Sequence, residues 1–136
     1  MTALHFQPIA GKTQDIIDAI LLTEEVASID SKVVGKIHLV CEELIANVVD
    51  YAYQASEEGY LDVDVDNTDG NLTIQFRDGG TPFDPLSHDM PDITLPLEER
   101  QIGGLGIFLT LKIMDSVTYH HVNGENVLTI SKVVKD

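Results

Sequence analysis

The sequence predicts an α+β domain, a two-layer sandwich in which helices cover one face of a mostly antiparallel sheet. Segments whose apolar residues recur three and four positions apart, as in helices, are interleaved with segments of alternating apolar and polar residues, as in strands. The order lacks the strand–helix–strand rhythm of a parallel sheet. The length of 136 residues suits one core, so a single domain is expected over residues 1–136.

The chain begins with a candidate edge strand and a first helix. Residues 4–9 suit a strand at the edge of a sheet, because Pro8 lacks the N–H that a central strand needs. Thr13 is a candidate N-cap for the helix that follows, and Asp15 lies in its first turn, where the helix dipole favours an acid. This helix is expected to end near Ser28.

A longer second helix carries two polar residues of interest. Its apolar residues recur over residues 33–52, and Asp30 or Ser31 is its candidate cap. At about 100° per residue, Glu43 and Asn47 lie one turn apart at the edge of the apolar stripe. They are either the ordinary polar flank of an amphipathic helix or a carboxylate and a carboxamide at the mouth of a pocket.

Two alternating stretches, residues 61–66 and 72–77, predict an antiparallel hairpin around a turn at residues 67–71. If the second strand stays regular, Asp78 continues its apolar set and points to the core side. A carboxylate there needs a partner, because an unpaired buried charge is costly. The alternative is that the strand ends at Arg77 and that Asp78, which two glycines follow, belongs to a turn.

The last part of the chain combines a long loop, a helix and a second hairpin. Four of the five prolines lie within residues 79–104, and a loop of this length is typically a lid or a binding loop. Residues 103–106, Gly-Gly-Leu-Gly, open a third helix. Such glycines expose N–H groups to a phosphate, although a simple turn is the more ordinary interpretation. Asn123-Gly124 predicts the turn between the final two strands.

The polar patches, in this order, resemble the N, G1 and G2 boxes of the GHKL (Bergerat-fold) ATP-binding superfamily. The boxes read Glu43-x-x-x-Asn47, Asp78-x-Gly80-x-Pro82-Phe83-Asp84-Pro85 and Gly103-Gly104-Leu105-Gly106-Ile107. Within the superfamily the sequence is most similar to the bacterial anti-sigma-factor serine/threonine kinases, because of its short length, the Pro-Phe-Asp-Pro extension and the run over residues 104–109. The resemblance covers roughly residues 5–133. Tyr51 departs from it, since these kinases often carry a histidine there.

The resemblance implies a Bergerat fold and a role for each motif residue. Asn47 would hold a Mg²⁺ ion that bridges the phosphates of ATP, and Glu43 would accept the proton of a serine or threonine hydroxyl. Asp78 would bind the adenine amino group, helped by Gly80 and by Thr129 on the last strand. The other expected nucleotide contacts are Pro82, Gly104, Leu105 and Gly106.

The ATP lid is expected over about residues 86–102. Arg100 is the cation best placed in the sequence to reach a phosphate, and a solvated loop arginine is the ordinary alternative. Pro91 and Pro96 lie within this stretch and would stiffen it.

The implied function is a protein serine/threonine kinase that regulates transcription by partner switching. In the family the acceptor hydroxyl lies on a small anti-sigma antagonist (anti-anti-sigma) protein, a sigma factor is a second candidate partner, and members are commonly homodimers. The alternative is a non-catalytic ATP-binding interaction module, because Glu43, the candidate base, is the single residue that favours a kinase over such a module. A detached catalytic domain of a sensor histidine kinase ranks third, since the G1 extension fits it poorly.

The composition disfavours several other classes. A net charge of −15 repels nucleic acid and anionic membranes. No apolar run is long enough to cross a bilayer, and the N-terminus lacks the pattern of a secretory signal. The single cysteine, Cys41, cannot form an internal disulfide and is expected in the core. These features favour the cytoplasm. Asp62, Asp64 and Asp66 are expected to form a solvated strand face, and His120-His121 a strand pair.

Overall fold

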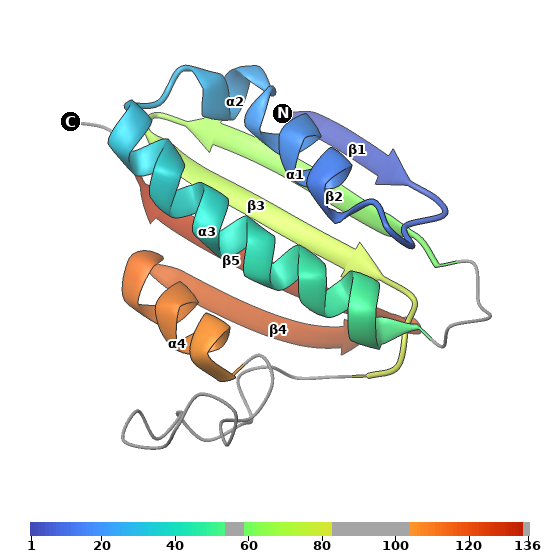
Figure 1. The fold of residues 1–136 in the computed structure, drawn as a ribbon. Coiled ribbons are helices and arrows are strands. Elements are labelled where there is room, and N and C mark those ends of the chain that lie inside the picture. Colours follow the sequence, from blue (N-terminus) through green and yellow to red (C-terminus); the bar gives the residue numbers. More distant parts are fainter. Residues whose placement is uncertain (54–58, 83–103, 135–136) are drawn as a thin grey trace.

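The computed structural model describes residues 1–53, 59–82 and 104–134, with only the backbone described for Tyr51 and for residues 104–108. Within these residues the domain has two layers, an antiparallel sheet of five strands and helices on one of its faces (Figure 1). The strands are β1 (Thr2–Phe6), β2 (Leu61–Thr68), β3 (Asn71–Asp78), β4 (Ser116–Val122) and β5 (Glu125–Val133), in the order β1-β2-β3-β5-β4. The predicted α+β sandwich is confirmed.

The helical layer consists of α1 (Thr13–Leu21), α2 (Glu24–Ala27), α3 (Ser31–Asn47), the π-helical turn η1 (Val48–Ala52) and α4 (Gly104–Ile113). The prediction of one helix from Thr13 to Ser28 is wrong, because α1 ends at Leu21 and α2 begins three residues later, at Glu24. Thr13 is the first residue of α1 and not its cap, which is Lys12. Asp30 does cap α3, since its carboxylate accepts a hydrogen bond from the Lys32 N–H at 2.9 Å.

The long helix changes its hydrogen-bond pattern at its C-terminal end. The sequence predicts a continuous helical stripe as far as Ala52, but regular α-helix ends at Asn47 and five residues of π-helix follow. A π-turn takes one more residue per hydrogen-bonded loop than an α-turn, so it rotates the following side chains relative to the stripe. Such turns are frequent at functional sites, and this one lies beside the hollow described below.

Both hairpins have the backbone geometry that their turn residues predict. Asp69 and Gly70 connect β2 to β3 with φ values of 52° and 81°. Asn123 and Gly124 connect β4 to β5 with φ values of 54° and 79°. Positive φ at both central residues is the requirement of a tight hairpin turn whose twist matches the strands, and Asp-Gly and Asn-Gly meet it at low steric cost.

The core lies between the helices and the sheet. Alternate residues of each strand face the helices, and register places Val63 opposite Phe76 and Val65 opposite Ile74. The side chains with no exposed surface include Ile16, Ile20, Ile37, Cys41, Ile45, Leu61, Val63, Val65, Leu72, Ile74 and Ile130. Cys41 is therefore a core residue, as expected, and burial raises the pKa of its thiol to about 12.

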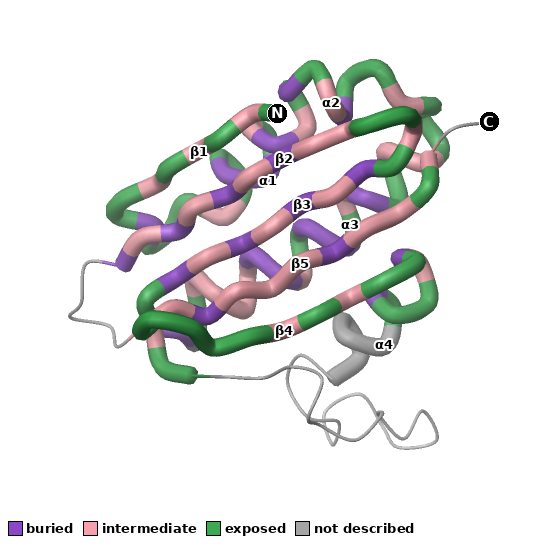
Figure 2. The backbone as a smooth tube through the Cα atoms, turned by 180° about the vertical axis from the view of Figure 1, so that it is seen from behind, coloured by how far each residue is buried: buried purple, intermediate pink, exposed green. Residues whose placement is uncertain are grey.

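Among the described residues no helix covers the other face of the sheet (Figure 2). The side chains of β2 and β3 that point to this face are polar, as at Asp64, Gln75 and Arg77. Asp62, Asp64 and Asp66 lie on it and are half-buried among their neighbours. The Arg77 guanidinium pairs with Asp64, and the His5 ring pairs with Asp62. These contacts indicate a charged strand surface, and in the described ranges no three His, Cys, Asp or Glu side chains gather as a metal site would require.

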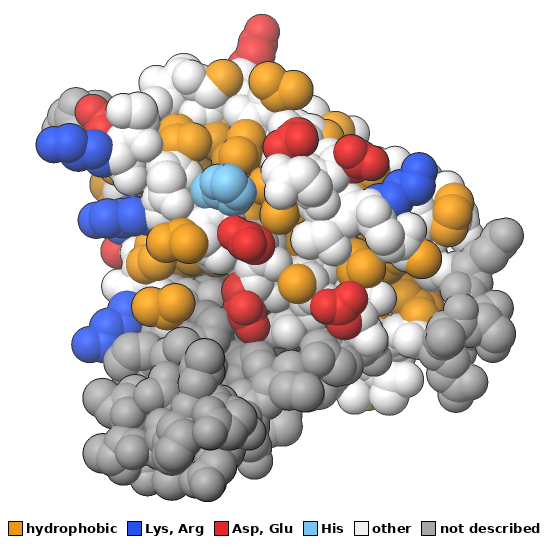
Figure 3. All heavy atoms as spheres, in the orientation of Figure 1, with side chains coloured by type: hydrophobic (Ala, Val, Ile, Leu, Met, Phe, Trp, Pro, Cys, Tyr) orange, Lys and Arg blue, Asp and Glu red, His pale blue; other side chains and the backbone are white. Residues whose placement is uncertain are grey.

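The surface over the helices carries many acidic side chains, in keeping with the net charge of −15 (Figure 3). Acidic side chains lie among apolar ones across this face, and Lys and Arg lie mainly towards its edges (Figure 3). No helix of the described chain is both long and apolar enough to span a membrane.

Candidate functional site

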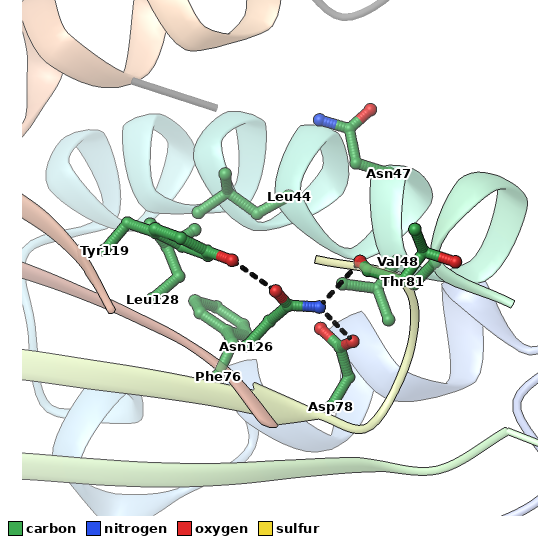
Figure 4. Close-up of a pocket in the computed structure, with 10 residues that line it drawn as sticks. Leu44, Asn47, Val48, Phe76, Asp78, Thr81, Tyr119, Asn126 and Leu128 are labelled. Atoms are coloured by element: carbon green, nitrogen blue, oxygen red, sulfur yellow. Dashed lines mark hydrogen bonds between the residues drawn. The ribbon is translucent and has the colours of Figure 1, made fainter. Parts of the chain in front are cut away.

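A hollow opens between the C-terminal end of the long helix and the adjoining parts of β3, β4 and β5 (Figure 4). The space within it, which includes some open solvent, amounts to about 540 Å³. The apolar lining residues are Leu44, Val48, Ala52, Phe76 and Leu128, and the polar ones are Asn47, Asp78, Thr81, Tyr119 and Asn126. The lining is thus an apolar slot with a few polar groups at fixed places.

Asp78 is the carboxylate of this hollow. It ends β3 on the helix-facing side and is only 5% exposed, so the expectation that it faces the core is confirmed. Its Oδ1 accepts hydrogen bonds from the Gly80 N–H at 2.9 Å and from the Asn126 amide at 3.0 Å. Burial raises the pKa of Asp78, and these two hydrogen bonds act in the opposite direction. Among the described residues, no hydrogen bond reaches the second oxygen, Oδ2.

Asn126 is a site residue that the sequence reasoning missed. Strand register places it directly opposite Asp78, and its amide also donates to the Thr81 carbonyl oxygen at 3.0 Å. The Tyr119 hydroxyl donates to the Asn126 side-chain oxygen, which orients the amide group towards Asp78 (Figure 4). The alternation along β5 indicates that Asn126 faces the helices, because Asn126 shares that side of the strand with Leu128 and the buried Ile130.

Thr129 was expected to help Asp78 bind the adenine amino group, and the register between β3 and β5 contradicts this expectation. Thr129 lies opposite Gln75, and its hydroxyl accepts a hydrogen bond from the Gln75 amide at 3.2 Å. Gln75 points to the face away from the helices, whereas Asp78 points towards them. Because side chains alternate along a strand, Thr129 and Asn126 lie on opposite faces. Thr129 therefore does not join Asp78 in the hollow.

The turn after β3 lies in close contact with η1. The Thr81 N–H donates to the Ala52 carbonyl oxygen at 2.7 Å. A Cβ atom on Gly80 would lie 2.2 Å from that same oxygen, so only glycine fits there. Gly80 thus lies beside Asp78, as expected, and holds the turn against the wall of the hollow. Pro82 is exposed and is not a lining residue.

Replacing Gly80 by alanine is expected to lower the free energy of unfolding by about 1–3 kcal/mol, because the methyl group would collide with backbone that cannot move aside cheaply. Chemical denaturation would measure the change. Gly35→Ala is the matched control: a Cβ on Gly35, within α3, meets nothing within 4 Å, so alanine there should stabilise the protein by up to about 1 kcal/mol. Equal effects of the two variants would contradict the steric explanation.

The two polar residues of the long helix occupy different places. Asn47 is the last residue of α3 and lines the hollow, with its side chain pointing away from Asp78 and Asn126 (Figure 4). Glu43 lies one turn earlier, is half-buried and is not a lining residue. Burial raises the pKa of Glu43, and the neighbouring Glu42 carboxylate raises it further. A raised pKa brings a carboxylate closer to the range in which it can act as a base near neutral pH.

The G2 glycines lie where a helix begins. Gly104, Leu105 and Gly106 form the first turn of α4, whose N–H groups have no partner within the helix. The side chain of Leu105 lies outside the described residues, as do Arg100 and the whole expected lid, residues 86–102. Their predicted roles stay predictions.

The chemistry of the lining suits the base of the nucleotide that the motifs predict. The apolar walls of the hollow suit a flat ring, and the buried Asp78 provides an acceptor for an exocyclic amine at one end. At the other end, Asn47 offers a neutral oxygen of the kind that Mg²⁺ accepts.

Fold and site together define a histidine kinase-like ATPase domain. Residues 10–132 match that family, and the chain belongs to it. Among characterised relatives, it is similar to the serine-protein kinase RsbW of Listeria monocytogenes, with 27% identity over 106 residues, 75% of this chain and 68% of the relative. It is also similar to the serine/threonine-protein kinase BtrW of Bordetella bronchiseptica, with 25% identity over 68% of this chain and 66% of the relative.

A solved structure supports the fold alone. The blue-light activated histidine kinase of Erythrobacter litoralis EL346 superposes with a TM-score of 0.60 at 14% identity. The match covers 91% of this chain but only 40% of that kinase, so the likeness concerns one domain of a longer protein.

Proposed function

We propose that this protein is an ATP-dependent serine/threonine kinase that acts as an anti-sigma-factor-type, partner-switching regulator. The observation that carries the proposal is the buried Asp78 at one end of an apolar hollow whose other end is marked by Asn47. The family membership supports ATP as the ligand. The similarity to relatives named as serine and serine/threonine kinases supports protein phosphorylation.

Different side chains of the described residues bind different parts of the nucleotide. The walls formed by Leu44, Phe76 and Leu128 exclude water from the two faces of the base. Asp78 Oδ2 accepts a hydrogen bond from the exocyclic amine. Asn47 would hold Mg²⁺ through its side-chain oxygen. The N–H groups in the first turn of α4, which have no partner within the helix, would favour the phosphates, because the N-terminus of a helix attracts anions.

Phosphoryl transfer itself needs a base, positioning and charge neutralisation more than covalent chemistry by the protein. Bound Mg-ATP would supply the γ-phosphoryl group: the hydroxyl oxygen would bond to the γ-phosphorus as the bond from that phosphorus to the β–γ bridging oxygen breaks, and ADP would leave. Glu43 accepts the proton of the incoming serine or threonine hydroxyl, and its raised pKa suits that task. Glu43 lies one turn from Asn47 on the same helix, so the base would lie near a Mg²⁺ ion held by Asn47.

The proposed substrate is a small anti-sigma antagonist protein with an acceptor serine or threonine, and a sigma factor is the proposed second partner. The net charge of −15 suits a partner with a basic surface and disfavours direct contact with nucleic acid. We also propose a homodimer, from the resemblance to the anti-sigma-factor kinases, and a cytoplasmic location, from the composition of the chain.

Calorimetric titration of the protein with ATP, with and without Mg²⁺, tests the nucleotide site first. We expect binding that Mg²⁺ strengthens, followed by transfer of labelled γ-phosphate to the antagonist protein from the same organism. Absence of ATP binding would contradict the proposed function, because every later step requires bound ATP.

A non-catalytic ATP-binding interaction module is the second candidate. The position of Glu43 outside the lining of the hollow favours it, because a base must reach its substrate. Magnesium-dependent ATP binding without transfer to any antagonist, together with a nucleotide-dependent change in partner affinity, would select this function over the kinase.

A further inference from the structure

Tyr53 links three segments around the hollow without lining it. Its hydroxyl accepts a hydrogen bond from the Gly79 N–H at 2.8 Å and donates one to the Tyr60 carbonyl oxygen at 2.8 Å. Tyr53 directly follows η1, Tyr60 directly precedes β2, and Gly79 directly follows β3. One hydroxyl group therefore fixes the end of the helical layer against two strand ends.

The aromatic rings around this hydroxyl are closely packed. A Cβ on Gly59 would lie 2.3 Å from the Tyr53 ring, and one on Gly79 would lie 2.9 Å from the Tyr60 ring. The Tyr60 hydroxyl donates to the Glu125 carboxylate at 2.5 Å, and Glu125 is the first residue of β5. The two rings lie 6.4 Å apart. The close packing of Gly59 on the Tyr53 ring, and the hydrogen bond from Tyr60 to Glu125, therefore restrict the movement of the Tyr53 hydroxyl.

The residue that Tyr53 holds is adjacent to the site. Gly79 lies between Asp78, whose carboxylate lines the hollow, and Gly80, whose N–H donates to that carboxylate. The Thr81 N–H is held by the Ala52 carbonyl oxygen, one residue before Tyr53. Residues 52 and 53 together fix the turn that follows Asp78, and of the two Ala52 lines the hollow whereas Tyr53 acts from outside it.

We propose that Tyr53 is a positioning residue for base recognition, which acts by holding the Gly79 backbone and so fixing the direction of the Asp78 carboxylate. This inference rests on the proposed binding of ATP. Asp78 distinguishes an exocyclic amine from a carbonyl oxygen only if Oδ2 stays at a fixed place in the plane of the base. If Gly79 is released, the turn can tilt, and the carboxylate tilts with it.

The test compares ATP with inosine triphosphate, which carries a carbonyl oxygen where adenine carries its amine. Tyr53→Phe keeps the ring packed on Gly59 and removes both hydrogen bonds of the hydroxyl. We expect ATP binding to weaken about threefold to tenfold, as expected for one or two modest hydrogen bonds. Binding of inosine triphosphate should change less, so the preference for ATP should fall.

Ser116→Ala is the control variant. It removes the hydrogen bond between the Ser116 and Ser131 hydroxyl groups, 2.6 Å long and on the face of the sheet away from the helices. Its preference for ATP should equal that of the wild type even if its stability falls. Thermal unfolding and circular dichroism of both variants would show that each is folded.

Three outcomes would overturn the inference. Tyr53→Phe could keep the wild-type preference, it could lose affinity for both nucleotides by the same factor, or the wild type could show no preference. In each case the wild type still binds ATP, so the proposed function survives. A wild type that binds neither nucleotide would overturn the proposed function and the positioning role together.

Discussion

Asp78→Asn is expected to weaken ATP binding about a hundredfold while the protein stays folded. Asparagine has the same shape, and its oxygen can still accept the hydrogen bonds from Gly80 and Asn126. Its NH₂ group then takes the place of Oδ2 and faces the amine of the base, donor against donor. The lost charged hydrogen bond and the new unpaired donor together amount to about 3 kcal/mol. Calorimetric titration with Mg-ATP measures the loss.

The same substitution should not lower stability, which separates the loss of a ligand contact from a loss of fold. Because burial raises the pKa of Asp78, the folded state binds its proton more tightly than the unfolded state does. The stability that this proton contributes is therefore complete in acid and is lost as pH rises through the folded-state pKa. Asparagine cannot ionise, so the stability of the variant relative to the wild type should increase from acid to neutral pH.

Asp66→Asn is the matched control for Asp78→Asn. It removes the same charge from the face of the sheet that points away from the helices, where the Asp66 side chain is half-exposed. This variant should bind ATP as the wild type does. Equal loss of binding in the two variants would mean that net charge, and not the contact at Asp78, controls affinity.

The part of the site that the sequence predicts correctly depends on local chemistry. Alternation over residues 72–77 is enough to point Asp78 towards the helices, because each strand residue reverses the side. The turn residues Asp69-Gly70 and Asn123-Gly124 fix both hairpins through their own backbone preferences. The family resemblance adds an expected role for Asp78, and that role stays a prediction.

The errors arise where distant segments decide the outcome. Asn126 and not Thr129 joins Asp78, because the register between β3 and β5 depends on pairing across some fifty residues of chain. The change from α-helix to π-helix after Asn47 accompanies the contact between Ala52 and the Gly80–Thr81 turn. No local propensity signals that contact. The sequence reasoning likewise placed Glu43 and Asn47 in one patch, whereas only Asn47 lines the hollow.

The position of Glu43 makes its substitution the decisive experiment on catalysis. Glu43→Gln should lower the rate of phosphate transfer to the antagonist protein by about a hundredfold to ten-thousandfold, the usual contribution of a general base. ATP affinity should stay within about twofold, because Glu43 is not among the residues that line the hollow. The measurements are transfer of labelled phosphate and, separately, calorimetric titration with Mg-ATP.

Glu42→Gln provides the control, since Glu42 is the exposed neighbour on the same helix. The Glu42 carboxylate raises the pKa of Glu43, so its removal should lower that pKa. A base with a lower pKa stays ionised in more acidic solution, and the acid limb of the pH–rate profile should therefore move to lower pH. The rate at neutral pH should change little. Such a shift without a loss of rate would identify Glu43 as the group that titrates, whereas undiminished transfer by Glu43→Gln would assign the base to another residue.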